Sequence, residues 1–331
     1  MPQAHGECPA KPQAADIPIK WLSVTGLRGG GLAGWLLAPV RLVRALLQSW
    51  RVLRQVRPRL VVGMGGFVSG PGGVAAWLAG IPLVIHEQNA VAGMTNRWLA
   101  RIASKILQGF DTAFAASAAV QTVGNPVRQD IRDLARPAER FGARQGPLRL
   151  LVIGGSLGAL ALNEHVASAI AGLPGDERPQ VRHQAGARTL EVAQDAYAKA
   201  GVRAEVTPYI DDMAGALAWA DAVICRAGAL TVSELINVGL GAVFVPFPHA
   251  VDDHQTRNAS VMVDAGAAVL LPQAQLDSTH LKKALASLGE DRAALLQRAE
   301  AARGLRGDDA VEQVLAICTG LIGTLGTEVS A

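Results

Sequence analysis

The feature that most constrains the fold is an apolar run followed by a glycine turn and a helix in the second half of the chain. Residues 222–225 are all apolar, which is typical of a strand buried in a parallel sheet. Gly228 ends the run, and residues 230–238 keep helical spacing. Free backbone N–H groups at such a turn favour an anion. Glu234, one turn into the helix, is then best explained as a ligand for a ribose diol. The alternative is an ordinary strand–helix unit with a solvated loop, because lone glycine turns have weak specificity.

The same pattern occurs in both halves of the chain. An apolar run ends at the glycine loop 63–73, and another ends at the glycine turn 154–159. Strands and helices alternate around both loops, which predicts an α/β fold with two doubly wound, Rossmann-like domains and a cleft between their strand ends. We expect four segments: a disordered leader at 1–16, an N-terminal domain at 17–128, a linker at 129–147 and a C-terminal domain at 148–331.

Charge is distributed unevenly along the chain. Residues 1–145 hold 17 Lys and Arg against 7 Asp and Glu, whereas the remainder holds 14 against 21, and no acid lies between Asp16 and Glu87. A basic helix with an apolar face is expected from Pro39 onward, after the apolar loop 32–37. This half is predicted to face the membrane and to dock on an anionic membrane surface, and no nucleic-acid partner is expected. The helix alone fits equally well as a core helix with a solvated arginine face.

The glycine loops do not predict a dinucleotide enzyme. Neither loop has the G-x-G-x-x-G spacing, and no acid ends a second strand as an NAD site requires. The carboxylate of Glu234 lies on a helix beside its own phosphate turn, which suits a nucleoside-diphosphate sugar. Asp252 and Asp253 offer two carboxylates without a third ligand, so we expect no metal and no cofactor.

Five motifs resemble the MurG-type glycosyltransferases. They are GMGGFVSGPGG at 63–73, HEQNAVAGMTN at 86–96, VGNPVR at 123–128, GGSLGA at 154–159 and CRAGALTVSEL at 225–235. The resemblance implies the GT-B fold, with two Rossmann-like domains. It also implies inverting transfer of N-acetylglucosamine from UDP-N-acetylglucosamine to undecaprenyl-diphospho-N-acetylmuramoyl-pentapeptide. It places the protein peripherally at the cytoplasmic face of the bacterial inner membrane, in peptidoglycan synthesis. Other proteins of cell-wall synthesis are further candidate partners.

The resemblance also implies roles for individual residues. On the donor side, Arg128 and Ser156 would contact the diphosphate, Gln255 would read sugar hydroxyls, and Asn89 would lie at the donor–acceptor junction. The residues expected to hold uracil and ribose are Ile210, Ala229, Leu230, Thr231, Val232, Ser233 and Glu234. The residues expected on the acceptor side are Ser69, His86, Glu87 and Asn96.

The sequence departs from the family pattern at its start. The family begins with an apolar strand, a G-G-T-G-G-H loop and a helix, none of which is found here. That loop carries a histidine that is the family's leading candidate for the general base. We therefore expect an incomplete first domain and an unassigned base, with His86 and Glu87 as the nearest titratable replacements. The chain is interpreted as a truncated or mis-started version of an active enzyme. The alternatives are a nonfunctional remnant and a non-catalytic nucleotide-sugar-binding protein at the membrane.

Overall fold

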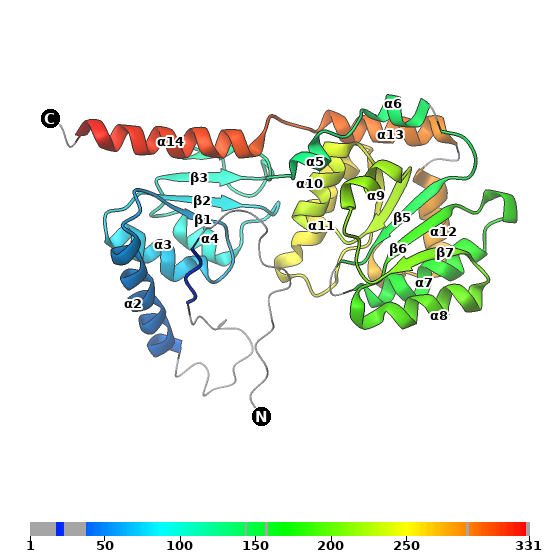
Figure 1. Ribbon diagram of the computed structural model, residues 1–331, viewed down its shortest axis with the longest axis horizontal. Helices are drawn as coiled ribbons and strands as arrows, with labels where there is room; N and C mark the ends of the chain where they lie inside the picture. Colours follow the sequence, from blue (N-terminus) through cyan, green and yellow to red (C-terminus); the bar gives the residue numbers. More distant parts are fainter. Residues whose placement is uncertain (1–17, 23–37, 143, 156–157, 289–290, 329–331) are drawn as a thin grey trace.

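The computed structural model describes residues 18–22, 38–142, 144–155, 158–288 and 291–328 (Figure 1). The first sheet has the strand order β1-β2-β3-β4, and every neighbouring pair is parallel. Its strands are β1 (Val61–Gly63), β2 (Leu83–Glu87), β3 (Lys105–Gln108) and β4 (Val120–Thr122). Residues 18–22 form no strand, and Trp21 is 82% exposed. Among the described residues, β1 therefore ends the sheet.

Helices cover the first sheet on both faces. Three helices of the first half lie between or before its strands in sequence: α2 (Ala38–Val56), α3 (Ser69–Leu78) and α4 (Met94–Leu99). On one face Leu83 and Ile85 pack with Leu99, while on the other Val84 packs with Leu107. Burial on both faces explains why β2 is an uninterrupted apolar run up to its last two residues.

The second sheet has the order β10-β9-β8-β5-β6-β7, again with parallel neighbours. Its strands are β5 (Arg149–Ile153), β6 (Gln180–Gln184), β7 (Ala204–Thr207), β8 (Ala222–Cys225), β9 (Gly241–Phe244) and β10 (Ala268–Leu270). The chain builds outward from β5 through β6 to β7, then returns to β8 on the other side of β5. Ligands of open α/β sheets bind beyond the strand ends at such a reversal. The two parallel sheets confirm the predicted fold class.

The second half contains seven described helices of seven or more residues before the final one, among them α12 and α13, which begin at capping aspartates. The seven helices are α7 (Leu160–Ala171), α8 (Leu190–Ala200), α9 (Met213–Trp219), α10 (Ala229–Val238), α11 (His254–Asp264), α12 (Ser278–Leu288) and α13 (Arg292–Gly304). Short 3₁₀ segments lie at η1 (Gly175–Glu177), η2 (Ala187–Thr189), η3 (Val251–Asp253) and η4 (Gln273–Gln275). The Asp291 carboxylate accepts a hydrogen bond from the Ala294 N–H at 2.8 Å, and Asp277 caps α12 in the same way through the His280 N–H.

The segment expected as a linker packs against the second core. It contains α5 (Gln129–Arg132) and α6 (Pro137–Gly142), and Ile131 is fully buried. Arg140 donates to the carbonyls of Val238 and Gly239 at 2.8 and 2.6 Å, which satisfies orphan carbonyls at the end of α10. The connection is therefore fixed to the second sheet by these contacts.

Helix α14 (Ala310–Glu328) returns to the first sheet (Figure 1). Its residues Val314 and Ile317 pack with Val84, Leu107 and Val123 of that sheet. Arg132 of α5 forms an ion pair with Asp309, with a nitrogen–oxygen distance of 2.6 Å, and this pair joins the start of α14 to α5. The final helix was expected within the domain at 148–331, whereas its packing places it on the first sheet.

His183 on β6 is a buried, neutral imidazole. Its Nδ1 pairs with the Tyr197 hydroxyl at 3.1 Å, and its Nε2 has no hydrogen-bond partner among the described residues. Burial lowers the pKa of His183 to about 4. Its side chain belongs to the core of the second sheet rather than to any predicted site.

This burial predicts acid sensitivity of the second sheet. In the unfolded chain His183 is protonated below about pH 6.5, whereas in the folded chain it stays neutral down to about pH 4. The free energy of unfolding is therefore highest above about pH 6.5 and decreases as the pH falls from about 6.5 to about 4. The loss should reach about 3 kcal/mol, because tenfold in proton affinity is about 1.4 kcal/mol. Urea unfolding followed by Trp219 fluorescence at several pH values measures it. His183→Gln should flatten the dependence; an unchanged pH profile in that variant would contradict the assignment.

Candidate functional site

Glu87, at the end of β2, organises the loop that follows it. Its carboxylate is 3% exposed and accepts four hydrogen bonds. Oε1 accepts from the backbone N–H and the side-chain amide of Asn89 at 3.0 and 3.1 Å, and Oε2 accepts from the Gly93 N–H and the Asn96 amide at 3.0 and 2.9 Å. Four bonds fill the acceptor sites of an ionised carboxylate. Residues 88–96 are thus wrapped around one buried charge.

His86 is fully buried beside it and fixes a second loop. Nε2 lies 2.9 Å from the Gly124 carbonyl, so Nε2 carries the proton, and Nδ1 accepts from the Gln88 amide at 3.1 Å. Burial lowers the pKa of His86, against the smaller opposing effects of the Gly124 carbonyl and Glu87. Because both ring nitrogens are engaged and the ring is neutral, this geometry suits a positioning group better than a general base. The base of the reaction stays unassigned.

The residues predicted on the acceptor side lie together around the glycine loop. Ser69 begins α3, and its hydroxyl donates to the Gly65 carbonyl at 2.5 Å. Asn96 is buried and donates to the His86 carbonyl at 3.1 Å. Gly65 has a φ of +81°, and a Cβ there would lie 3.1 Å from Oε1 of Gln88 and 3.4 Å from the amide of Asn96. The left-handed backbone at this position favours glycine.

The residues predicted on the donor side lie mainly on α10. Glu234 is half-buried; burial raises the pKa of its carboxyl, and the Arg128 guanidinium acts in the opposite direction. Gly228, at the N-cap, provides no side-chain cap for the first turn. Free N–H groups and a carboxylate one turn later are therefore available on one helix, as an anionic nucleotide with a ribose requires.

The other predicted donor residues divide into exposed and buried groups. Leu230 is exposed and Thr231 is half-buried, whereas the side chains of Ala229 and Val232 are buried and offer only their backbone. Ile210 packs against the core of the second sheet. The side-chain oxygen of Gln255 accepts from the Phe247 N–H at 2.9 Å. Ser156 lies outside the described residues.

Buried amides join the two halves of the chain. Asn258 of α11 donates to Oδ1 of Asn89 at 3.2 Å, which joins the loop after β2 to the second domain. The role of Asn89 at a donor–acceptor junction stays a prediction. Asn125 donates to the Ser233 hydroxyl at 2.9 Å, and that hydroxyl donates to the Ala229 carbonyl at 2.8 Å. Asn125 and Asn258 were not among the predicted site residues. The available signals were the place of Asn125 in the 123–128 motif and that of Asn258 one turn after Gln255.

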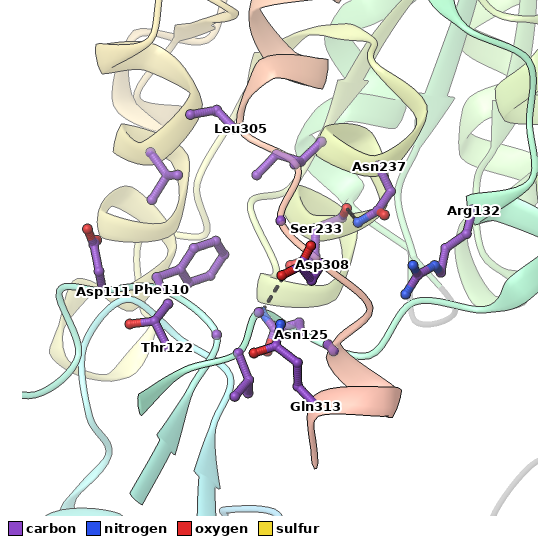
Figure 2. A pocket seen from close by; sticks show the side chains of 17 residues that line it. Phe110, Asp111, Thr122, Asn125, Arg132, Ser233, Asn237, Leu305, Asp308 and Gln313 are labelled. Atoms are coloured by element: carbon purple, nitrogen blue, oxygen red, sulfur yellow. Dashed lines mark hydrogen bonds between the residues drawn. The ribbon is translucent and has the colours of Figure 1, made fainter. Parts of the chain in front are cut away.

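A cavity of about 430 Å³ lies between the domains, beside the Asn125–Ser233 hydrogen bond (Figure 2). Its walls come from the ends of β3 and β4, from α10 and α11, and from the connection between α13 and α14. The charged side chains in its lining are Asp111, Arg132 and Asp308. Of the predicted site residues that the structure describes, only Ser233 lines it, so this cavity is distinct from the donor and acceptor groups described above.

Comparison with known proteins identifies the family. Residues 4–108 match the glycosyltransferase family 28 N-terminal domain, and residues 149–314 match the glycosyltransferase family 28 C-terminal domain. The chain belongs to glycosyltransferase family 28. It is 54% identical over 303 residues to a protein of Marinobacter nauticus, covering 92% of this chain and 84% of that one. A protein of Alkalilimnicola ehrlichii is 55% identical, with coverage of 92% and 85%. Both are named UDP-N-acetylglucosamine–N-acetylmuramyl-(pentapeptide) pyrophosphoryl-undecaprenol N-acetylglucosamine transferase.

Solved structures agree with this family 28 assignment. The crystal structure of Acinetobacter baumannii MurG matches with a TM-score of 0.78 at 39% identity, covering 91% of this chain and 85% of that one. The calicheamicin glycosyltransferase CalG4 matches with a TM-score of 0.64 at 17% identity, over 88% of this chain and 82% of that one, which shows the fold alone. The resemblance to MurG-type enzymes and the GT-B fold predicted from the sequence are both confirmed.

The Glu87 contacts predict a stability effect of a nearly isosteric change. Glu87→Gln replaces one acceptor oxygen by a donor that faces donors, leaving buried N–H groups unpaired. We expect the free energy of unfolding of the first domain to fall by at least about 2 kcal/mol, and the Gly93 amide to exchange faster. Denaturant unfolding and exchange measure the two effects. The exposed Glu139→Gln is the matched control, and equal stability of both variants would contradict the role given to Glu87.

Proposed function

We propose that this chain transfers N-acetylglucosamine from UDP-N-acetylglucosamine to the muramoyl 4-hydroxyl of undecaprenyl-diphospho-N-acetylmuramoyl-pentapeptide. The observation that carries the proposal is the identity of about half of all residues to transferases of that name over 92% of this chain. The bond between the sugar C1 and the diphosphate breaks, the acceptor oxygen bonds to C1 with inversion, and UDP leaves. The proton of the acceptor hydroxyl passes to a general base that is not assigned to a residue. The product is the lipid-linked disaccharide precursor of peptidoglycan.

The described residues support donor binding on the second domain. The uncapped first turn of α10 offers N–H groups to the diphosphate, where charge grows as UDP leaves. Glu234 would accept hydrogen bonds from both ribose hydroxyls, with Arg128 close enough to favour its ionised form. Because burial raises the pKa of Glu234, donor affinity should weaken as pH falls and the carboxyl is protonated.

Removal of Glu234 tests the donor assignment and the reaction together. Charge-assisted hydrogen bonds contribute about 1.5–3 kcal/mol each, so Glu234→Ala should weaken UDP binding at least about tenfold. Calorimetry with UDP measures this, and labelled donor with a lipid-linked acceptor measures transfer. The exposed Glu312→Ala serves as the control. Unchanged UDP affinity in Glu234→Ala would contradict the assignment. Donor binding by the unmodified chain without product would instead support a non-catalytic nucleotide-sugar-binding protein.

We further propose that α2 docks on an anionic membrane at the cytoplasmic face of the inner membrane. The helix has four arginines and no acid, and Val43 and Leu47 on its apolar side are 56% and 53% exposed. Exposed tryptophans lie on the neighbouring helices, Trp77 on α3 and Trp98 on α4. Apolar side chains with a basic rim are typical of helices that lie in the membrane interface. Within the described residues, no helix combines the length and apolarity that a membrane crossing requires.

Vesicle sedimentation tests this docking. Binding to phosphatidylglycerol-containing vesicles should fall with salt, because each Lys or Arg near such a surface contributes about 1 kcal/mol and is screened. The double variant Val43→Ser, Leu47→Ser should lose most of the binding. Leu315→Ser on α14, with a leucine 57% exposed, is the matched control and should bind as before. Equal binding to neutral and anionic vesicles at every salt concentration would overturn the proposal.

A further inference from the structure

Asn258 on α11 joins three backbone or side-chain groups from both halves of the chain. Its Oδ1 accepts from the Ala90 N–H at 2.8 Å, and its Nδ2 donates to Oδ1 of Asn89 at 3.2 Å and to the Ala227 carbonyl at 3.1 Å. The side chain is fully buried. Ala227 immediately precedes the Gly228 turn of α10, whereas Asn89 and Ala90 belong to the loop built around Glu87. One amide therefore fixes the acceptor-side loop to the donor-side turn.

Asn125 makes a second connection between the same two regions. Its Nδ2 donates to the Ser233 hydroxyl and to the Gln88 carbonyl, both at 2.9 Å. Ser233 lies one residue before Glu234 on α10. The side chain is seated directly on Gly109, where a Cβ would collide with it. Asn125 is thereby held between the end of β3 and the donor helix, and the hydrogen bond to Ser233 is the dashed line in Figure 2.

His86 and Glu87, the last two residues of β2, each form a hydrogen bond to a residue that adjoins or contacts one of these two amides. Glu87 fixes the Asn89 side chain that receives the bond from Asn258. His86 fixes the Gly124 carbonyl, next to Asn125. Each residue thus acts through a loop on one of the two interdomain connections. This explains why both are buried and fully hydrogen-bonded while lying in a motif beside the reaction centre.

We propose that Asn258 and Asn125 form an interdomain clamp that positions the acceptor-side loop against the donor-side helix during sugar transfer. The inference rests on the function proposed above. Both are positioning residues: they hold Asn89 and Glu234 in register across the domain boundary. A displacement of about 1 Å at the reacting groups can cost about a hundredfold in rate. Loss of the clamp should therefore lower kcat, while the donor contacts made by α10 itself remain.

Steady-state kinetics of single variants test the clamp. Asn258→Ala and Asn125→Ala should each lower kcat at least about tenfold and change the donor KM less than about threefold. Asn258→Asp keeps the shape but faces a carboxylate oxygen toward the oxygens of Asn89 and Ala227, so its kcat should fall below that of Asn258→Ala. A loss of packing alone would give the opposite order, since Asp fills the site and Ala does not.

Gln108 supplies the matched control. It is a buried amide whose bonds, to the Thr122 hydroxyl at 2.9 Å and from the Phe114 N–H at 2.9 Å, remain within the first half of the chain. Gln108→Ala should lose stability but keep kcat within about threefold of the parent. Equal kcat losses in Gln108→Ala and Asn258→Ala, or an unchanged kcat in the clamp variants, would overturn the proposal.

Hydrogen exchange tests the clamp independently of any reaction. In Asn258→Ala the Ala90 amide loses its acceptor and should exchange faster, while the Gly93 amide, bound to Glu87, should not change. Equal protection of Ala90 in both proteins would overturn the clamp itself. If Ala90 responds as expected and the parent chain forms no product, the proposed function fails and the clamp stands as a structural feature.

Discussion

The buried carboxylate of Glu87 is the constraint on which the rest of the site depends. An ionised group without water is costly unless every lone pair is occupied, and here four donors from residues 89–96 supply that compensation. The loop can adopt few other conformations without exposing or orphaning the charge. Since Asn89 and Ala90 are fixed in this way, the contacts that they make with Asn258 of the other domain are fixed as well.

Local pattern predicted some of the elements, although it missed α5 and α6 in the segment expected as a linker. The apolar run at 222–225 forms β8, and Gly228 is the N-cap of α10. These features depend on neighbours in sequence: burial on both faces of a parallel strand, and N–H groups left free in a first turn. The grouping of Ser69 in the glycine loop with His86, Glu87 and Asn96 was expected from the resemblance to the family and not from local pattern.

Contacts between distant segments could not be predicted from the sequence. Helix α14 has an apolar side that would fit either domain, and only its packing with Val84 and Leu107 shows that it covers the first sheet. In the sequence, His86 and Glu87 are two titratable residues at a strand end, a pattern that is typical of catalytic pairs. Their burial and complete hydrogen bonding depend on Gly124 and on residues 88–96, so their geometry indicates a positioning role.

The boundary between the domains combines apolar and polar contacts near the site. Ala90 and Phe110 of the first half belong to the same buried apolar cluster as the second core, and such contacts favour one arrangement of the domains. An amide hydrogen bond contributes only about 0.5–1.5 kcal/mol net, since water takes its place when the partners separate. The bonds of Asn258 and Asn125 can therefore define a precise closed position at small cost to opening. Helix α14 keeps the domains connected on the side of Arg132 and Asp309, so separation at the amides need not separate the domains. The domains can then separate to admit a large lipid-linked substrate and return to the same relative position for the transfer step.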